Sequence, residues 1–343
     1  MKKFNDWFLA LSAVAALACA LPALVRLITA KPERTPFTLY SCTVHDFTSL
    51  YQDDGRDYSF VDRAGTVHGD EAQPLFYASI LASKGALPDT LEGRAVTLEE
   101  IERNNLILST DPRDVNKSVP PVYPLMESVP ERLELQDPEE AVVSRKEALY
   151  IYHMGNRALD AEKTEQLNDG LREQGFVFPA RLVDGNPTDR KDHDEGYLLT
   201  DARNRLFHFK QENGQIQVEH FPAADDLNVK FLKITEFENR ATLGMLVTGE
   251  GQMAFLRPDG TVTVTEVSFD PEKEDLLIVG DLFYYTVKTA TAAGEHFWAL
   301  RSSDFSLVDS MDRPYERHWT LPSLRFTSPV DSHVKPRLTG FQE

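Results

Sequence analysis

The longest run of apolar residues lies at the start of the chain. From Trp7 to Val25 there are nineteen residues without a formal charge, and two lysines precede them. At about 1.5 Å rise per residue, a helix of this length can cross a hydrocarbon core of roughly 30 Å. Basic residues before such a run are typical of an N-terminus that stays in the cytoplasm. The pattern predicts a transmembrane helix over residues 7–29, with residues 1–6 on the cytoplasmic side.

Three other interpretations of this segment are left open by the sequence. Ala18-Cys19-Ala20 or Ile28-Thr29-Ala30 could form a cleavage site, although the apolar run exceeds the roughly 7–15 residues of a signal peptide. Cys19 could carry a lipid, although apolar residues rather than a polar linker follow it. A buried helix of a soluble protein is the third, although this segment is apolar on every side. We therefore expect an uncleaved anchor.

After the apolar run, the pattern changes to short alternating stretches separated by turns. Residues 30–36 contain two prolines and are expected to form an extended linker. A first strand is expected over Phe37–Phe47. A hairpin is expected next, in which Tyr58–Val61 and Thr66–His68 flank a turn. The sequence thus predicts that a strand-rich domain begins at residue 37.

The clearest repeat lies in the last third of the chain, where two groups of three short strands have the same cadence. The first group is Tyr197–Asp201, Leu206–Phe209 and Gln215–Val218, and the second is Met245–Thr248, Met253–Leu256 and Thr261–Val264. Residues 276–287 and 297–308 continue this rhythm. Repeated antiparallel meanders are typical of propeller blades. The sequence predicts a mainly β fold, a propeller-like array of short antiparallel meanders with helical insertions, and a β-sandwich with insertions is the alternative.

Helical spacing of apolar residues interrupts the strand pattern near residues 71–104 and 160–174. In the first insertion, Thr97 is followed three residues later by a glutamate, which predicts a capped helix start. In the second, Asp160 is the expected N-cap, and a strand is expected to resume at Phe176.

The end of the chain, residues 313–343, is rich in proline and also contains aromatic residues. Proline at this density favours an extended backbone. The aromatic residues indicate that part of this tail docks on its own domain or, alternatively, on a partner. The sequence therefore predicts one extracytoplasmic β-rich domain over residues 37–312, followed by an extended tail.

Charge and cysteine content narrow the possible partners. The chain has 36 basic and 55 acidic residues, a net charge of −19, and setting aside Lys2, Lys3, Arg26 and Asp6 leaves 33 and 54, or −21. Such a domain repels phosphates, so we expect no nucleic-acid partner. One of the two cysteines lies in the apolar run, so the other, Cys42, has no partner for an internal disulfide and is expected to be a small buried residue.

Common catalytic and cofactor signatures are absent from the sequence. It contains no G-x-x-x-x-G-K-[ST] loop, dinucleotide glycine fingerprint, H-E-x-x-H motif or G-x-S-x-G elbow. The densest polar cluster, Asp189–Gly196, is oxygen-rich like a Ca²⁺ loop, but two basic residues interrupt it, so a solvated loop is preferred. His208 is expected to be a surface or hydrogen-bonded core residue rather than a metal ligand. The nine scattered histidines are His45, His68, His153, His193, His208, His220, His296, His318 and His333.

Several segments resemble an uncharacterised family of single-pass, membrane-anchored Bacteroidetes proteins, defined only as a domain of unknown function. They are Thr35–Phe47, Tyr58–Asp62, Pro74–Tyr77, Gly85–Asp89 and Leu198–Phe209. The resemblance implies an exported, membrane-anchored protein that works beside an export-type transporter. It implies no catalytic residues.

These observations favour a non-enzymatic binding or accessory protein of unknown ligand, associated with a membrane complex such as a transporter. It would lie in the cytoplasmic (inner) membrane as a single-pass protein, with its C-terminal domain in the periplasm and its contact with the bilayer through residues 7–29. The alternatives are an extracytoplasmic hydrolase of glycans or peptides, whose carboxylates only the fold could bring together, and a structural protein of envelope assembly. The sequence predicts no catalytic, cofactor-binding or metal-binding residue and no cofactor.

Overall fold

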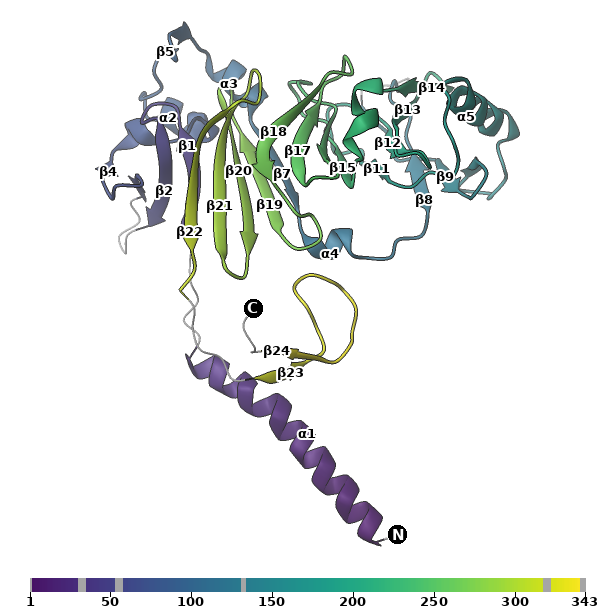
Figure 1. Cartoon of the computed structure of the whole chain (residues 1–343). Helices are drawn as coiled ribbons and strands as arrows, with labels where there is room; N and C mark the ends of the chain where they lie inside the picture. The colour runs from purple at the N-terminus through teal and green to yellow at the C-terminus, as the bar shows by residue number, and fades with distance from the viewer. Residues whose placement is uncertain (1, 30–34, 53–57, 131–133, 317–321, 340–343) are drawn as a thin grey trace.

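A single long helix opens the computed structural model, which describes residues 2–29, 35–52, 58–130, 134–316 and 322–339. This helix, α1 (Lys2–Thr29), projects away from the rest of the molecule in Figure 1. Its stretch Lys3–Val25 is long and apolar enough to cross a membrane, judged by length and composition. The predicted helix is therefore present and ends where expected, but it begins five residues earlier. Most of the predicted linker, residues 30–34, lies outside the described residues.

Most of the remaining described chain forms antiparallel sheets, as the pattern predicted. Within the described residues, five sheets have three or more strands, and in four of them the strands follow one another as simple meanders. The first sheet contains β1 (Phe37–Ser41), β2 (Asp46–Gln52), β3 (Tyr58–Val61) and β4 (Val67–His68). The second contains β8 (Val122–Leu125), β9 (Glu140–Ser144) and β10 (Leu149–His153). The third sheet contains β11 (Val183–Gly185), β12 (Tyr197–Thr200), β13 (Leu206–Glu212) and β14 (Gln215–His220). The fourth contains β15 (Phe231–Ile234), β16 (Gly244–Val247), β17 (Gln252–Leu256) and β18 (Val262–Ser268).

The fifth sheet combines strands from distant parts of the chain. It contains β19 (Asp275–Gly280), β20 (Tyr284–Thr291), β21 (Gly294–Arg301), β22 (Leu307–Pro314) and, at its edge, β7 (Leu106–Thr110). β7 pairs antiparallel with β19, with Ile278 opposite Leu108. The N-terminal half of the domain therefore completes a sheet that the C-terminal part begins.

Four apolar cores join the five sheets into a row, which Figure 1 shows from the side. The β8–β10 sheet packs on β11–β14 through residues such as Ile151 and Phe207, and β12 packs on β15 and β16 through Leu198. Phe255 of β17 packs on Tyr285 of β20. The last core joins β1 and β2 to β20 and β21. Successive meanders that pack face to face make the array propeller-like, as predicted.

The predicted repeat is confirmed in its strands, and the structure extends it. The two groups of three strands correspond to β12–β14 and β16–β18. Each sheet has one further strand at its start, β11 or β15, which the pattern did not indicate. Each repeat is therefore a four-stranded meander.

Short helices occupy both predicted insertions. The first contains the 3-10 helices η1 (Asp70–Ala72) and η2 (Leu75–Tyr77), then α2 (Ala78–Ser83), the hairpin β5 (Thr90–Leu91) and β6 (Arg94–Ala95), and α3 (Leu98–Asn104). Thr97 caps α3 by accepting a hydrogen bond from the Glu100 amide at 3.2 Å. The second insertion is α5 (Ala161–Glu173), which Asp160 caps as predicted. Two other elements are α4 (Pro112–Val115) and η3 (Pro222–Leu227).

Two predicted strands are wrong in detail. Residues 37–47 form two strands rather than one, because the chain turns between β1 and β2, where His45 has a φ of 55°. Phe176 begins no strand. Its amide closes the end of α5 by donating to the Leu171 carbonyl at 2.8 Å, and its ring packs edge-on against Phe178 and Phe207. Burial of these aromatic rings, rather than a sheet ladder, explains the apolar run.

The tail contains a short hairpin, β23 (Ser323–Arg325) with β24 (Arg337–Thr339), and β23 lies beside α1. Between these strands, the Pro329 carbonyl accepts a hydrogen bond from Arg113 at 3.1 Å, and the Val330 carbonyl accepts one from Asn116 at 2.8 Å. The described part of the tail therefore contacts its own domain near α4.

Candidate functional site

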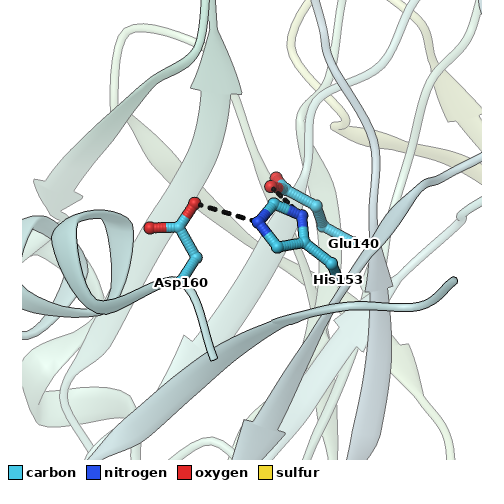
Figure 2. Close-up of side chains that lie close together, drawn as sticks. All are labelled: Glu140, His153 and Asp160. Atoms are coloured by element: carbon cyan, nitrogen blue, oxygen red, sulfur yellow. Dashed lines mark ion pairs between the residues drawn. The ribbon is translucent and has the colours of Figure 1, made fainter. Parts of the chain in front are cut away.

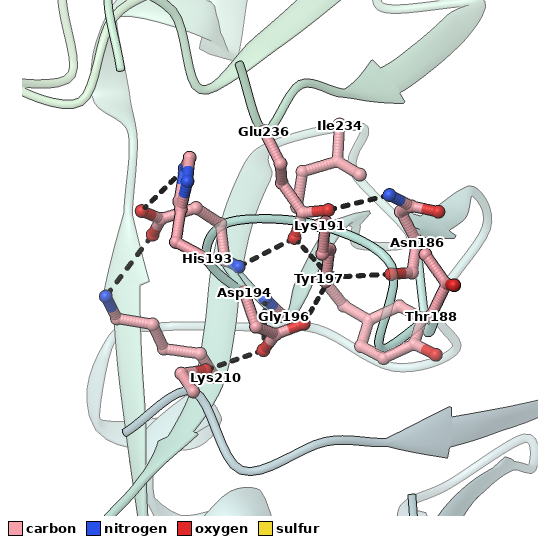
Figure 3. Close-up of polar contacts among 12 residues, drawn as sticks. Asn186, Thr188, Lys191, His193, Asp194, Gly196, Tyr197, Lys210, Ile234 and Glu236 are labelled. Atoms are coloured by element: carbon pink, nitrogen blue, oxygen red, sulfur yellow. Dashed lines mark hydrogen bonds and ion pairs between the residues drawn. The ribbon is translucent and has the colours of Figure 1, made fainter. Parts of the chain in front are cut away.

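The polar loop between β11 and β12 contains a buried ion-pair network (Figure 3). The Lys191 side chain is only 5% exposed, and its ammonium lies 2.6 Å from carboxylate oxygens of both Asp194 and Glu236. It also donates to the Asn186 carbonyl at 2.6 Å. Glu236 follows β15 in the neighbouring sheet. Lys191 therefore connects two successive sheets of the array.

Two carboxylates at this junction have raised pKa values. Burial raises the pKa of Glu236, and the Lys191 ammonium partly offsets the shift. Glu236 also accepts hydrogen bonds from the Glu195 amide at 2.7 Å and from the Asn186 side chain at 2.9 Å. Burial likewise raises the pKa of Asp184, which faces Lys233 at 3.6 Å. Each carboxylate faces a lysine and accepts a hydrogen bond from a backbone amide, which suits a fixed structural contact.

The prediction of a solvated loop at Asp189–Gly196 is correct for only part of it. Asp189, Arg190 and Asp192 are exposed, whereas His193 and Asp194 are buried. The loop alternates between solvent and the interior because its inward side chains fill the junction between sheets. Burial lowers the pKa of His193.

Two other predictions about polar residues agree with the structure. His208 is buried, its Nε2 is hydrogen-bonded to the Glu195 carbonyl, and burial lowers its pKa. It is therefore a hydrogen-bonded core histidine. Cys42 is buried in the core that joins β1 to β20, and burial raises the pKa of its thiol.

A second polar cluster combines a histidine with two carboxylates (Figure 2). Glu140 and His153 are direct partners across the β9–β10 hairpin, and Asp160 precedes α5. The His153 Nδ1 lies 3.3 Å from Glu140 Oε1, and its Nε2 lies 3.6 Å from Asp160 Oδ2. One ligand atom from each residue lies within 4.8 Å of the others. The Lys163 ammonium also contacts Glu140, at 2.7 Å. We name Glu140, His153 and Asp160 together the Glu140 cluster.

Sequence reasoning missed the Glu140 cluster because it sought pairs of histidines at helical spacing. The signal lay in hairpin register, since strands at 140–144 and 149–153 with a short turn place residue 140 opposite residue 153.

A pocket of about 640 Å³ lies where the β1–β4 sheet meets the first helical insertion. Its wall combines aromatic and aliphatic side chains with an ion pair, in which Lys84 contacts Asp70 at 2.7 Å. The lining residues are Leu50, Tyr58, Phe60, Asp70, Gln73, Tyr77, Ile80 and Lys84. An apolar wall with a few polar groups is the usual composition of a ligand pocket. We call it the β3–α2 pocket.

Comparison with known proteins places the chain in a family. Residues 37–300 match the model of a domain of unknown function, DUF4857. The chain belongs to this family. The DUF4857 match begins with β1 and ends in β21, so it includes the lysine network, the Glu140 cluster and the β3–α2 pocket. It does not include α1, and the bacterial group and the single-pass anchoring implied by the resemblance stay predictions.

Solved structures similar to this DUF4857 protein include two described as the structure of the Dos1 propeller and as dihydro-heme d1 dehydrogenase NirN in complex with DHE. The first has a TM-score of 0.32 and 8% identity over 82% of this chain and 62% of the other. The second has a TM-score of 0.27 and 11% identity over 75% of this chain and 64% of the other. The chain thus spans less than two thirds of either structure. No curated protein matches the sequence.

Proposed function

We propose that this DUF4857 protein is anchored in the cytoplasmic membrane by α1, and that its periplasmic β domain binds a ligand as an accessory to a membrane complex such as a transporter. The exposure of α1 carries the proposal. Trp7 is 72% exposed and Leu11 68% exposed, and only 6% of the most apolar window is buried. Each such side chain would gain about 1.5–3 kcal/mol by leaving water. A bilayer is the environment that satisfies them together.

Membrane fractionation tests the anchor. The full-length chain should stay in the membrane pellet after an alkaline carbonate wash and dissolve only in detergent. The double variant Leu11→Arg, Leu17→Arg should be released, since an arginine near the middle of a span costs about 2.5–3.5 kcal/mol. Val264→Arg, an exposed position on β18, is the matched control and should stay in the pellet. Release of the unaltered chain by carbonate would refute the anchor.

Reporter fusions test the orientation. Alkaline phosphatase fused after residue 343 should be active in intact cells. Green fluorescent protein fused at the same position and exported by the same route should not fluoresce. The reverse pair of results would place the domain in the cytoplasm.

The β3–α2 pocket is the surface that we assign to the ligand or partner. Tyr58 is 61% exposed at its rim, while Phe60 at its wall is buried. A photo-crosslinking residue at position 58, illuminated in intact membranes, should capture a transporter subunit. The same residue at Val264 is the control and should not capture it. Equal capture from both positions, or a partner known only from envelope assembly, would contradict the accessory role.

The lysine network supports binding over hydrolysis. Two carboxylates with raised pKa values, Asp184 and Glu236, face Lys233 and Lys191 respectively, and each accepts a backbone hydrogen bond. Their contacts connect neighbouring sheets, which is a structural task.

A further inference from the structure

The imidazole of His153 lies between two carboxylates, one at each ring nitrogen. A neutral imidazole carries a single N–H, so one of its nitrogens directs a lone pair at a carboxylate oxygen. The distance between Nε2 and Asp160 Oδ2, 3.6 Å, is also too long for a hydrogen bond. A lone pair that faces an anionic oxygen favours a cation between them.

We propose that Glu140, His153 and Asp160 bind a divalent transition-metal ion of the Zn²⁺ class. Bonds of about 2.0–2.2 Å at tetrahedral angles place ligand atoms roughly 3.4 Å apart. The separations of 3.3 and 3.6 Å end at different ring nitrogens, and one ion binds only one of them. One ligand atom from each of the three residues lies within 4.8 Å of the other two, and this is the set that a single ion would draw together. An imidazole together with carboxylates suits Zn²⁺ better than Mg²⁺ or Ca²⁺, which prefer oxygen ligands alone.

The three ligands are held by parts of the fold that need not change when a metal binds. Strand register fixes Glu140 opposite His153. Asp160 caps α5 with its Oδ1, which accepts from the Lys163 amide at 2.9 Å, so its Oδ2 is left to face His153. The domain's net charge of −21 raises the local concentration of cations.

Lys163 is the competitor for this site. Its ammonium lies 2.7 Å from Glu140 Oε2, where it neutralises a carboxylate that is otherwise buried. A metal ion at Glu140 would repel this ammonium, whose long side chain can withdraw toward solvent. Removal of the ammonium should therefore strengthen metal binding, whereas a purely structural ion-pair cluster gains no metal affinity from this change.

The test measures Zn²⁺ binding by calorimetry to the full-length chain in detergent, after chelator treatment and in excess Mg²⁺ to saturate nonspecific acidic sites. The unaltered chain should bind one Zn²⁺ at this site. His153→Ala should weaken that binding at least about tenfold, the size of loss seen when a metal site is disturbed. Lys163→Met should tighten it. Asp160→Asn should weaken it while keeping the helix capped, because asparagine and aspartate are equally good N-caps.

His220→Ala is the matched control, because His220 contacts a single carboxylate, Asp225, at 2.9 Å. It should leave Zn²⁺ affinity unchanged. Thermal unfolding gives a second readout, since Zn²⁺ should raise the Tm of the unaltered chain and of His220→Ala but not that of His153→Ala. The proposal is overturned if His153→Ala binds Zn²⁺ as tightly as the unaltered chain, or if Lys163→Met gives no gain.

Discussion

Asp281, in the turn between β19 and β20, offers a direct test of how burial acts on charge in this domain. Its side chain is 6% exposed, and its Oδ1 accepts hydrogen bonds from the Phe283 amide at 2.8 Å and the Tyr284 amide at 2.9 Å. Burial raises the pKa of Asp281 from 3.8 to about 6, against the effect of these two donors, and the nearby Glu92 raises it further. An asparagine at this position would keep an acceptor oxygen but could not ionise. We therefore expect Asp281→Asn to change the pH dependence of stability.

The sign and size follow from the two pKa values. The folded chain holds the Asp281 proton more tightly than the unfolded chain, so this contribution to stability is complete below pH 4 and is lost as the pH rises through 6. A shift of about 2 pKa units corresponds to about 3 kcal/mol. About half of the loss has already occurred at pH 5. The free energy of unfolding of Asp281→Asn should therefore rise relative to the unaltered chain by about 1.5 kcal/mol between pH 5 and 8.

Urea unfolding of the full-length chain in detergent, followed by tryptophan fluorescence at several pH values from 5 to 8, measures this difference. The lower limit stays just above the sequence pI of about 4.9. Asp259→Asn is the control, since Asp259 lies exposed in a turn and asparagine keeps its hydrogen bond to the Thr261 amide. A constant difference between Asp281→Asn and the unaltered chain across this range would refute the reasoning.

Two further substitutions, at Lys191 and Gly196, test the loop between β11 and β12. Lys191→Met leaves the Glu236 carboxylate buried without its cation and should destabilise the chain by about 3–5 kcal/mol, and a loss below 1 kcal/mol in urea unfolding would contradict the buried pair. Gly196→Ala should cost at least about 2 kcal/mol, because Gly196 has a φ of +63° and an added Cβ would lie 2.4 Å from the Phe209 carbonyl oxygen. Gly214→Ala, with a φ of +74° but open space around it, should cost only about 1 kcal/mol in the same urea unfolding assay. Equal losses at the two glycines would show that contact with Phe209 does not matter.

Local pattern was sufficient to predict much of this fold. The alternation in β14 and the tight turns after β12 and β16 are properties of neighbouring residues, so the meanders could be recognised from sequence. The β7–β19 pairing could not, because strand register between distant segments depends on the packing of the whole array. Phe176 misled because a buried aromatic residue after a helix has the same local pattern as the start of a strand.

The polar sites were less accessible than the fold. Asp160 was identified from sequence as a helix cap, and that role is confirmed. Its position beside His153 follows from where α5 docks on β10, which no spacing along the chain encodes. Lys191 was grouped with the exposed residues around it because a sequence does not show that Glu236 approaches from the next sheet.

The placement of β7 also constrains how the polypeptide acquires its structure. As the chain is synthesised, β7 emerges before the three sheets formed by β8–β18, and its partner β19 follows only after all of them. Until then β7 is an unpaired edge, and contacts so distant along the chain slow folding. In repeat arrays whose units contact only their neighbours, truncation after any unit leaves a folded piece. Here a chain that stops before β19 leaves both β7 and the β1–β4 sheet without the surface on which they pack.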